Sequence, residues 1–270
     1  MKNTREISLG LVILLLNISL FSFSQTQFRF QENKGQLPNS VFSKVKIPGG
    51  SIFIEKGKFL YSFYNSKQLQ EKHDLIRKEN WIDAHSFSAT FLNSFESSEI
   101  KLDEKSDYFE NFYKSEITVE GVHFYKELEQ KNIYPGIDLK MYFYENNLKY
   151  DLIIHPNTNE RKIRIKYKGQ DNIFLRNDNL IIETSVNTVT ELAPFAYQII
   201  NDSISPVECK FKLKNNILSF EFPNSYDNTK DLVIDPTLIF STYSGSTADN
   251  FGYTATYDNF GFLYSGSTVF

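Results

Sequence analysis

A strict alternation of apolar and polar residues around the pair Asn215–Asn216 constrains the fold more than any other feature of the sequence. Asparagine tolerates the positive φ angles that both central positions of a type I′ turn require, so the pair predicts a two-residue hairpin. A turn there sets apolar residues opposite one another on one face: Leu213 with Leu218, Phe211 with Phe220, and Cys209 with Phe222. A slip of one residue would place lysine opposite phenylalanine, so the pattern predicts this register. It also predicts that Cys209 packs as a small apolar residue.

A second hairpin follows the same logic around Asn146–Asn147. A turn at these two residues would pair Phe143 with Tyr150, Met141 with Leu152, and Leu139 with Ile154. The chain also holds 25 Phe and 16 Tyr residues, which suit a pleated surface. Alternating or aromatic-rich runs predict further strands at 51–54, 59–64, 87–91, 162–167, 180–184, 195–200 and 232–234. The polar segment 65–80 is compatible with either a short surface helix or a mobile loop.

Short spacings of Gly, Asn, Asp and Pro separate these strands, as is typical of antiparallel sandwiches or barrels. We therefore expect an all-β fold with an antiparallel, sandwich-like N-terminal module over residues 25–235. This module is either one unit or two sub-domains that meet near residues 105–115. At about residue 236 the charged residues thin out, and Pro236 cannot donate to a strand ladder. We expect residues 236–270 to begin a different, truncated domain.

The N-terminal residues 1–24 have the character of a secretory signal peptide. Lys2 and Arg5 precede an apolar run from Ile7 to Phe23, and small residues stand before a predicted cleavage between Ser24 and Gln25. An uncleaved membrane anchor is the alternative, although the run is shorter than the roughly 20 residues of a typical span. No later stretch is apolar enough to cross a bilayer, so we expect no transmembrane segment after cleavage. Localisation outside the cell or at its surface is expected.

The charge balance and the histidine spacing exclude several functional classes. Without the first 24 residues the chain carries 27 basic and 32 acidic residues, which gives no support to nucleic-acid binding. The four histidines lack metal-ligand spacing, and no serine lies in a nucleophile motif. We therefore expect no catalytic residue, no cofactor and no metal. Asp258–Gly261 is interpreted as a hairpin turn rather than a calcium loop.

Two residues are candidates for surface chemistry. Trp81 could stack on a sugar, with a buried core tryptophan as an equal alternative. Ser203 lies in the segment Asp202-Ser203-Ile204, which resembles an O-glycosylation acceptor of bacterial envelope proteins. A plain Asp/Ser turn is the simpler interpretation of that segment.

Several dispersed motifs resemble a known arrangement of domains. Residues 238–253 and 257–266 are similar to the first unit of SBBP-type β-propeller repeats. Upstream, the motifs Phe30–Pro38, Gly49-Gly50, Tyr134–Leu139, Ala193–Gln198 and Ile234–Thr237 resemble an uncharacterised all-β domain that precedes such repeats in surface proteins of gliding bacteria. The resemblance implies further propeller repeats and a type IX secretion sorting domain beyond this sequence. It brings no established catalytic residues.

These observations lead to a hypothesis of a non-enzymatic, secreted or cell-surface module for structure or adhesion. Its expected partners are surface glycans or envelope proteins. The alternative is an accessory domain of an envelope hydrolase that acts on polysaccharide, with its active site outside this sequence. A third possibility is a module that only aids export or assembly. The oligomeric state is left open.

Overall fold

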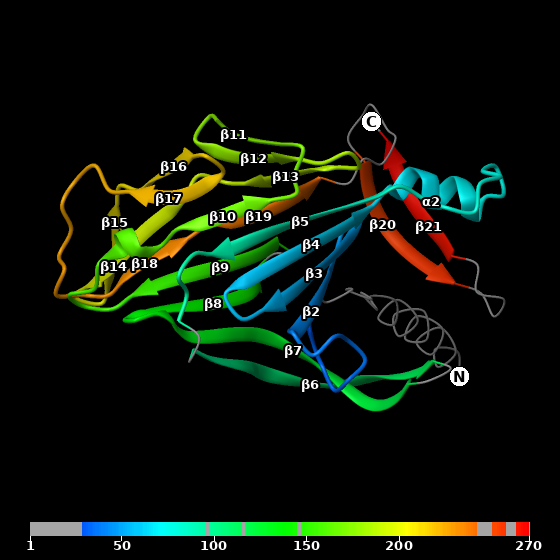
Figure 1. The fold of residues 1–270 in the computed structure, drawn as a ribbon. Coiled ribbons are helices and arrows are strands. Elements are labelled where there is room, and N and C mark those ends of the chain that lie inside the picture. The colour runs from blue at the N-terminus through cyan, green and yellow to red at the C-terminus, as the bar shows by residue number, and fades with distance from the viewer. Residues whose placement is uncertain are drawn as a thin grey trace, which may run out of the picture.

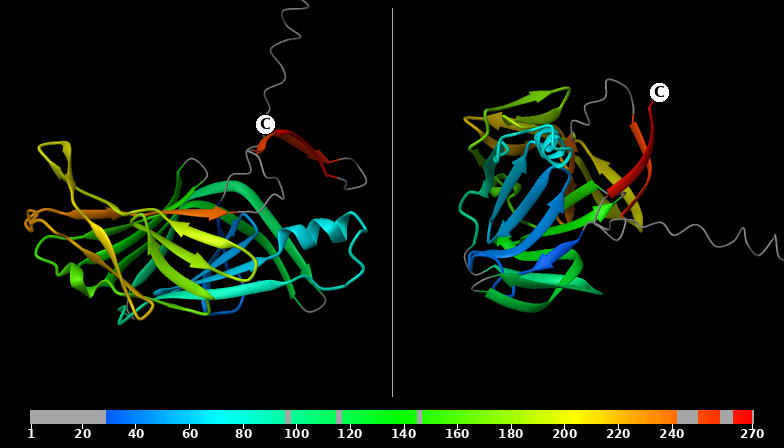
Figure 2. Two further views of the ribbon diagram at one scale, coloured as in Figure 1. Left: turned by 90° about the horizontal axis from the view of Figure 1, so that it is seen from above. Right: turned by 90° about the vertical axis from the view of Figure 1, so that its right-hand side faces the viewer.

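The computed structural model describes residues 29–95, 98–114, 117–144, 147–241, 250–257 and 263–269. Most of these residues lie in β-strands, and nineteen strands join into one antiparallel sheet (Figure 1). The prediction of an all-β, antiparallel fold is confirmed. The two faces that were expected from two packed sheets belong instead to a single sheet that curves round into a nearly closed, barrel-like shape (Figure 2).

One half of the sheet begins as a meander of five strands that are consecutive in the chain, and it continues with strands from later parts of the chain. In spatial order it contains β1 (Phe30–Glu32), β2 (Val41–Ile47), β3 (Gly50–Glu55), β4 (Lys58–Tyr64), β5 (Ala84–Phe91), β10 (Ile165–Lys168), β17 (Ile217–Glu221) and β16 (Lys210–Lys214). The predicted strands near residues 51, 59 and 87 are confirmed as β3, β4 and β5.

The other half starts from the second edge of β1. It contains β7 (Ile117–Tyr134), β8 (Ile137–Tyr144), β9 (Asn147–Ile154), β19 (Thr237–Ser241), β13 (Thr188–Glu191), β12 (Asn179–Glu183) and β11 (Asn172–Arg176). The terminal strands β11 and β16 come close together, but among the described residues no ladder joins them.

Two extensions leave this ring. The 16-residue strand β6 (Glu99–Lys114) pairs along β7, so the break expected near 105–115 falls within this hairpin. From β9 a branch runs through β18 (Leu232–Asp235), β14 (Phe195–Ile200) and β15 (Ser203–Val207). The strands β20 (Asn250–Tyr257) and β21 (Leu263–Val269) form a separate hairpin. The first strand after Pro236, β19, pairs inside the main sheet.

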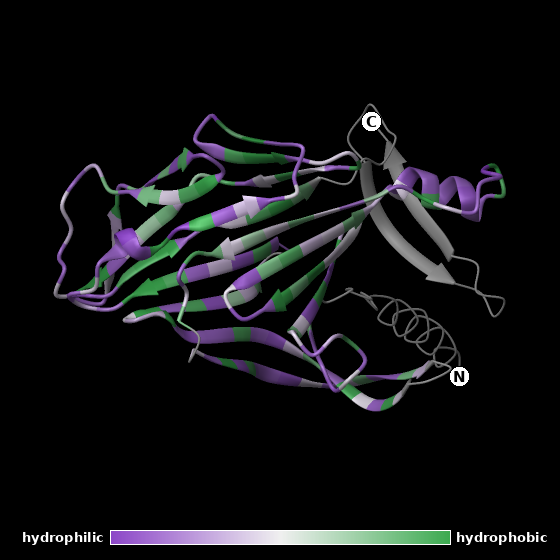
Figure 3. Ribbon diagram, viewed as in Figure 1, coloured by the Kyte–Doolittle hydropathy of each residue, from purple (hydrophilic) through white to green (hydrophobic). Residues whose placement is uncertain are grey.

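The core lies inside the curved sheet, because every second side chain of the inner strands points there. This alternation is visible along the strands in Figure 3. Tyr61 and Phe87 stack with ring centroids 4.5 Å apart, and Phe63 packs beside them. Phe63 and Phe87 are fully buried. Each such ring contributes about 1.5–3 kcal/mol by leaving water, which makes the inner aromatic layer a main source of stability.

Paired Asn and Asp residues make the tight hairpin turns. Asn215 and Asn216 both have positive φ, and so do both residues of the turns at 177–178 and 201–202. The predicted pairs of Leu213 with Leu218 and of Phe211 with Phe220 are confirmed. The β16–β17 ladder ends one residue before the predicted third pair. Cys209 and Phe222 lie just beyond it, partly buried against the core.

The register predicted for the second hairpin is wrong by two residues. Phe143 pairs with Leu148, Met141 with Tyr150, and Leu139 with Leu152. The ladder ends with Tyr144 opposite Asn147, and residues 145–146 lie outside the described residues. A two-residue shift keeps the alternation intact, so the predicted side chains still face inward.

The polar segment 65–80 begins as a short surface helix, α2 (Ser66–His73). Asn65 caps it, because its side-chain oxygen accepts the backbone N–H of Gln68 at 3.1 Å. The helix buries none of its residues, and its ribbon is mostly hydrophilic in Figure 3. A single 3₁₀ turn, η1 (Glu160–Lys162), lies before β10. Within the described ranges, no helix is both long and apolar enough to span a membrane.

Candidate functional site

A groove of about 660 Å³ lies beside the β1–β2 loop. This loop is the blue segment next to the β6–β7 hairpin in Figure 1. The groove is lined by Glu32, Asn33, Gly35, Asn39, Ser40, Val41, Phe42, Lys56, Ile100 and Leu102. Its volume is in the range of sites that hold a small ligand or one unit of a larger one.

Asn33 gives the loop its shape. Its side-chain amide donates to the carbonyl oxygens of Pro38 at 3.0 Å and Val41 at 2.7 Å. Its side-chain oxygen accepts the backbone N–H groups of Gly35 at 2.9 Å and Leu37 at 3.2 Å. Gly35 has a φ of 111°, which favours glycine at that position. Asn33 therefore fixes the internal conformation of the loop, which is preformed before any ligand arrives.

Two charged side chains tie the loop to β7. The Glu32 carboxylate accepts the His123 backbone N–H at 2.8 Å and the Tyr125 hydroxyl at 3.2 Å. The Lys34 ammonium donates to the carbonyl oxygens of Glu120 at 3.0 Å and Gly121 at 3.2 Å. These contacts fix the loop against a long strand, so the loop is attached rigidly to the sheet.

The walls of the groove combine apolar and polar groups. Phe42 sits where the β2–β3 register shifts, and 36% of its surface is exposed. Ile100 and Leu102 from β6 are partly buried. Asn39 stands at the rim, and among the described residues its amide makes no hydrogen bond. A ring or side chain can pack on Phe42 while its polar groups bind at this rim.

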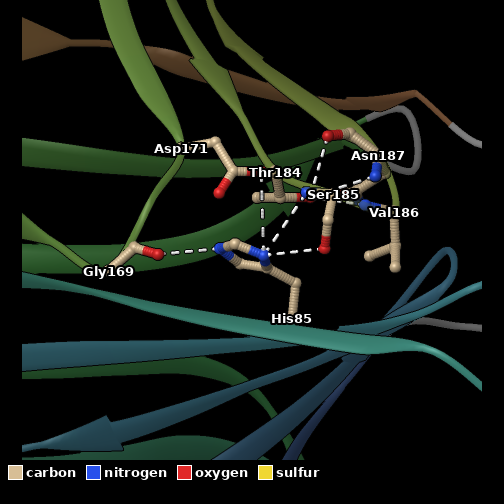
Figure 4. Close-up of polar contacts among 7 residues, drawn as sticks. All are labelled: His85, Gly169, Asp171, Thr184, Ser185, Val186 and Asn187. Atoms are coloured by element: carbon tan, nitrogen blue, oxygen red, sulfur yellow. Dashed lines mark hydrogen bonds and ion pairs between the residues drawn. The ribbon is translucent and has the colours of Figure 1, made fainter.

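A second cluster joins the strand β5 to the β10–β11 loop and the β12–β13 loop (Figure 4). The Nε2 atom of His85 lies 2.7 Å from the carbonyl oxygen of Gly169, and its Nδ1 atom lies 3.0 Å from the hydroxyl oxygen of Ser185. A carboxylate oxygen of Asp171 is 4.0 Å from Nδ1. The arrangement brings a serine, an imidazole and a carboxylate together from distant parts of the chain.

The backbone N–H groups next to Ser185 are already used. The N–H groups of Val186 and Asn187 donate to the Thr184 hydroxyl at 3.3 and 3.0 Å. The N–H of Ser185 itself donates to His85 Nδ1 at 3.3 Å. An acyl-transfer enzyme needs donors aimed at the developing oxyanion, and these three groups do not supply them. The cluster therefore lacks a main part of a hydrolase site.

A buried carboxyl lies inside the core. Glu191 projects inward from β13, is 1% exposed, and accepts hydrogen bonds from the hydroxyl groups of Tyr150 and Tyr167. Burial raises the pKa of Glu191 to about 7, although the two tyrosine hydroxyls oppose the shift. Burial and the nearby carboxyl also raise the pKa values of the tyrosines. The cavity beside this carboxyl measures only about 10 Å³, so the carboxyl bears on stability rather than on ligand binding.

A third histidine joins three strands of the sheet. His155 lies 3.0 Å from Asp138 through Nε2 and 3.1 Å from Asp231 through Nδ1. The hydrogen bonds to these carboxylates raise the pKa of His155, although partial burial opposes them. Both ring nitrogen atoms are engaged by carboxylates, so the contact works as a clamp.

The residues predicted from the sequence do not gather in one place. Trp81 lies in the segment between α2 and β5 and is 65% exposed, so it is not a core residue, and it does not line the groove. Ser203 is the exposed first residue of β15, directly after the turn Asn201–Asp202. Ser24 and Gln25 lie outside the described residues. Burial raises the pKa of Cys209 to about 12, in keeping with a packed thiol.

Sequence reasoning missed both the groove and the buried carboxyl. The run Asn33-Lys-Gly-Gln-Leu-Pro38 was a signal for the first, because a short polar residue before glycine and proline is typical of a side-chain-bonded turn. The alternation in Thr188–Glu191 was a signal for the second, since it sets Glu191 on the same face as Val189. Neither signal identifies a ligand.

A comparison with protein families gives one match. The family described as a domain of unknown function, DUF7948, matches residues 30–237. The chain belongs to the DUF7948 family. These residues include the groove, the Ser185 cluster and Glu191. No curated protein and no solved structure matches the chain.

Proposed function

We propose that this DUF7948 chain is a non-enzymatic surface module that binds envelope glycans through the groove at the β1–β2 loop. The observation that carries the proposal is the preformed groove, in which a phenylalanine ring stands beside amide, hydroxyl and ammonium groups. Sugars present apolar C–H faces and a rim of hydroxyl groups, so a ring beside hydrogen-bonding groups suits them.

The rigidity of the groove supports binding rather than turnover. Its loop is fixed by Asn33 and by contacts to β7, so little conformational entropy is lost when a ligand enters. Among the described residues, the cluster with a serine and a histidine lacks oxyanion donors. These features favour adhesion over the alternative of a polysaccharide hydrolase.

The cellular setting is part of the same proposal. The signal-like residues 1–24 support export and cleavage between Ser24 and Gln25. The likeness of residues 238–266 to SBBP-type repeats supports a place before a β-propeller in a larger, gliding-associated protein exported by type IX secretion. In that setting the DUF7948 domain would present its groove at the cell surface, and Trp81 and a glycosylated Ser203 would be further surface features.

The proposal is tested with a chain that starts at Gln25, applied to an array of bacterial envelope glycans and then to the same glycans in solution. We expect retention of at least one glycan without any release of shorter fragments. Phe42→Ala should abolish retention, whereas Phe195→Ala removes an exposed phenylalanine of similar accessibility outside the groove and should retain it. Turnover of any glycan, or equal binding by both variants, would refute the proposal. Binding only to glycan-free envelope proteins would favour a protein partner instead.

A further inference from the structure

We propose that Ser185 is a nucleophilic hydroxyl that accepts an acyl group from an activated ester, with His85 as its general base. The inference is independent of the glycan groove, because the two sites share no residue. It assigns a covalent modification site to the turn between β12 and β13.

The protonation state of His85 follows from its partners. The carbonyl oxygen of Gly169 can only accept a hydrogen bond, so Nε2, at 2.7 Å, carries the proton of the neutral ring. Nδ1 is then the acceptor atom of the ring, and both the Ser185 hydroxyl at 3.0 Å and the Ser185 backbone N–H at 3.3 Å donate to it. A serine that donates to an oriented imidazole lone pair is the arrangement that activates a hydroxyl for attack.

The surroundings stabilise the charged ring that forms when the proton moves. Asp171 from the loop before β11 lies 4.0 Å from Nδ1, and among the described residues it gives the only ion-pair distance to this ring. The other groups at the ring are uncharged: Gly169 after β10, Ser185 after β12, and Phe63 opposite it on β4. A nearby carboxylate favours the imidazolium.

The hydroxyl is also accessible. Ser185 is an exposed residue, whereas the His85 side chain is only 13% exposed. The base is thus shielded while the nucleophile faces solvent. A small ester can reach the hydroxyl oxygen from outside without any movement of the sheet.

The step balances without any oxidant or reductant. The Ser185 oxygen attacks the ester carbonyl carbon and its proton passes to His85 Nδ1. The tetrahedral intermediate then expels the alkoxide or phenoxide, which takes the proton from the imidazolium, and an ester remains on Ser185. Because the neighbouring N–H groups are used by Thr184 and His85, both acylation and later hydrolysis are slow. We therefore expect one stable acyl group per chain and no turnover.

The test uses the chain from Gln25 with p-nitrophenyl acetate, followed by intact mass and peptide mapping. We expect a single acetyl group on the peptide that contains Ser185, absent in Ser185→Ala and unchanged in Ser86→Ala, an exposed serine next to His85 in sequence. His85→Gln keeps a donor for Gly169 but removes the base, and it should slow labelling at least tenfold.

A purely structural role for the cluster predicts different results. The variants would then change the melting temperature without changing which residue is labelled. Labelling spread over many serines, or a labelling rate that is unchanged in His85→Gln, would overturn the proposal. If His85→Gln does not fold, the labelling rate of Asp171→Asn tests the proposal instead. A two- to fivefold slower labelling at Ser185 supports the proposal, and an unchanged rate contradicts it.

Discussion

Glu32 and Glu191 are two carboxyl groups of the same sheet that differ in burial and in their hydrogen-bond partners. Glu32 sits at the groove, partly exposed, where a backbone N–H and a tyrosine hydroxyl bind it. Glu191 sits in the core with two tyrosine hydroxyls and, among the described residues, no cation in contact. The first arrangement fixes a loop at little free-energy cost, while the second buries a group that resists ionisation. Glu32 therefore helps to make the surface site rigid, whereas Glu191 makes the free energy of unfolding depend on pH.

The largest effect is expected from the buried carboxyl. Its folded pKa of about 7 lies above the ordinary value of 4.5, so the stability it allows is fully present below about pH 4.5 and is lost as the pH rises through 7. The loss amounts to about 3 kcal/mol at pH 9. Glu191→Gln should remove this pH dependence and raise the free energy of unfolding at pH 9, with little change at pH 5. Urea unfolding at pH 5 and pH 9 measures this free energy. An equal change between the two pH values in both proteins would contradict the account.

A smaller effect on stability is expected from Asn33, which holds the β1–β2 loop. Asn33→Ala removes five hydrogen bonds within residues 33–41 and should cost about 2 kcal/mol of folding free energy, since each net bond contributes about 0.5–1.5 kcal/mol and the loop can in part relax. Asn39→Ala is the matched control, because it removes an asparagine from the same loop without a hydrogen bond. Hydrogen exchange of the amides of Gly35 and Leu37 should quicken in the first variant alone. Equal protection in both variants would show that Asn33 does not hold the loop.

The exposed clamp at His155 should contribute less. Its pKa is raised by two carboxylates, so its stabilisation is present below the ordinary pKa of about 6.5 and is lost as the pH rises above the folded value. The ring is 42% exposed, and solvent screening limits the gain to less than about 1 kcal/mol. His155→Gln should lower the melting temperature at pH 5.5 more than at pH 8.5. A larger loss at pH 8.5 would reverse the sign and contradict the assignment.

The smallest effect on stability belongs to Trp81. Because 65% of its surface is exposed, Trp81→Ala should change the free energy of unfolding by less than about 0.5 kcal/mol. If Trp81 stacks on a glycan, the same variant lowers glycan affinity while the melting curve is unchanged. A large loss of stability would show that the tryptophan packs in solution.

The sequence predicts local pairing well and long-range closure poorly. The turn at Asn215–Asn216 and its first two cross-strand pairs follow from chirality and alternation within fourteen residues. The predicted register of the hairpin near residue 146 is wrong by two residues, because alternation alone permits any even shift. The groove and the Ser185 cluster unite residues that lie 60 to 100 positions apart, such as Phe42 with Leu102 and His85 with Ser185. Local patterns carry no information on which distant strands meet, so these sites emerge only from the three-dimensional arrangement of the sheet.

The central claim is that the preformed groove binds a glycan without hydrolysing it. Calorimetric titration of a retained glycan into the chain from Gln25 and into Phe42→Ala and Phe195→Ala tests it most directly. The account predicts that Phe42→Ala loses at least tenfold in affinity, that Phe195→Ala matches the unchanged chain, and that the glycan is recovered intact. Equal affinity for all three proteins, or a shortened glycan, would contradict it.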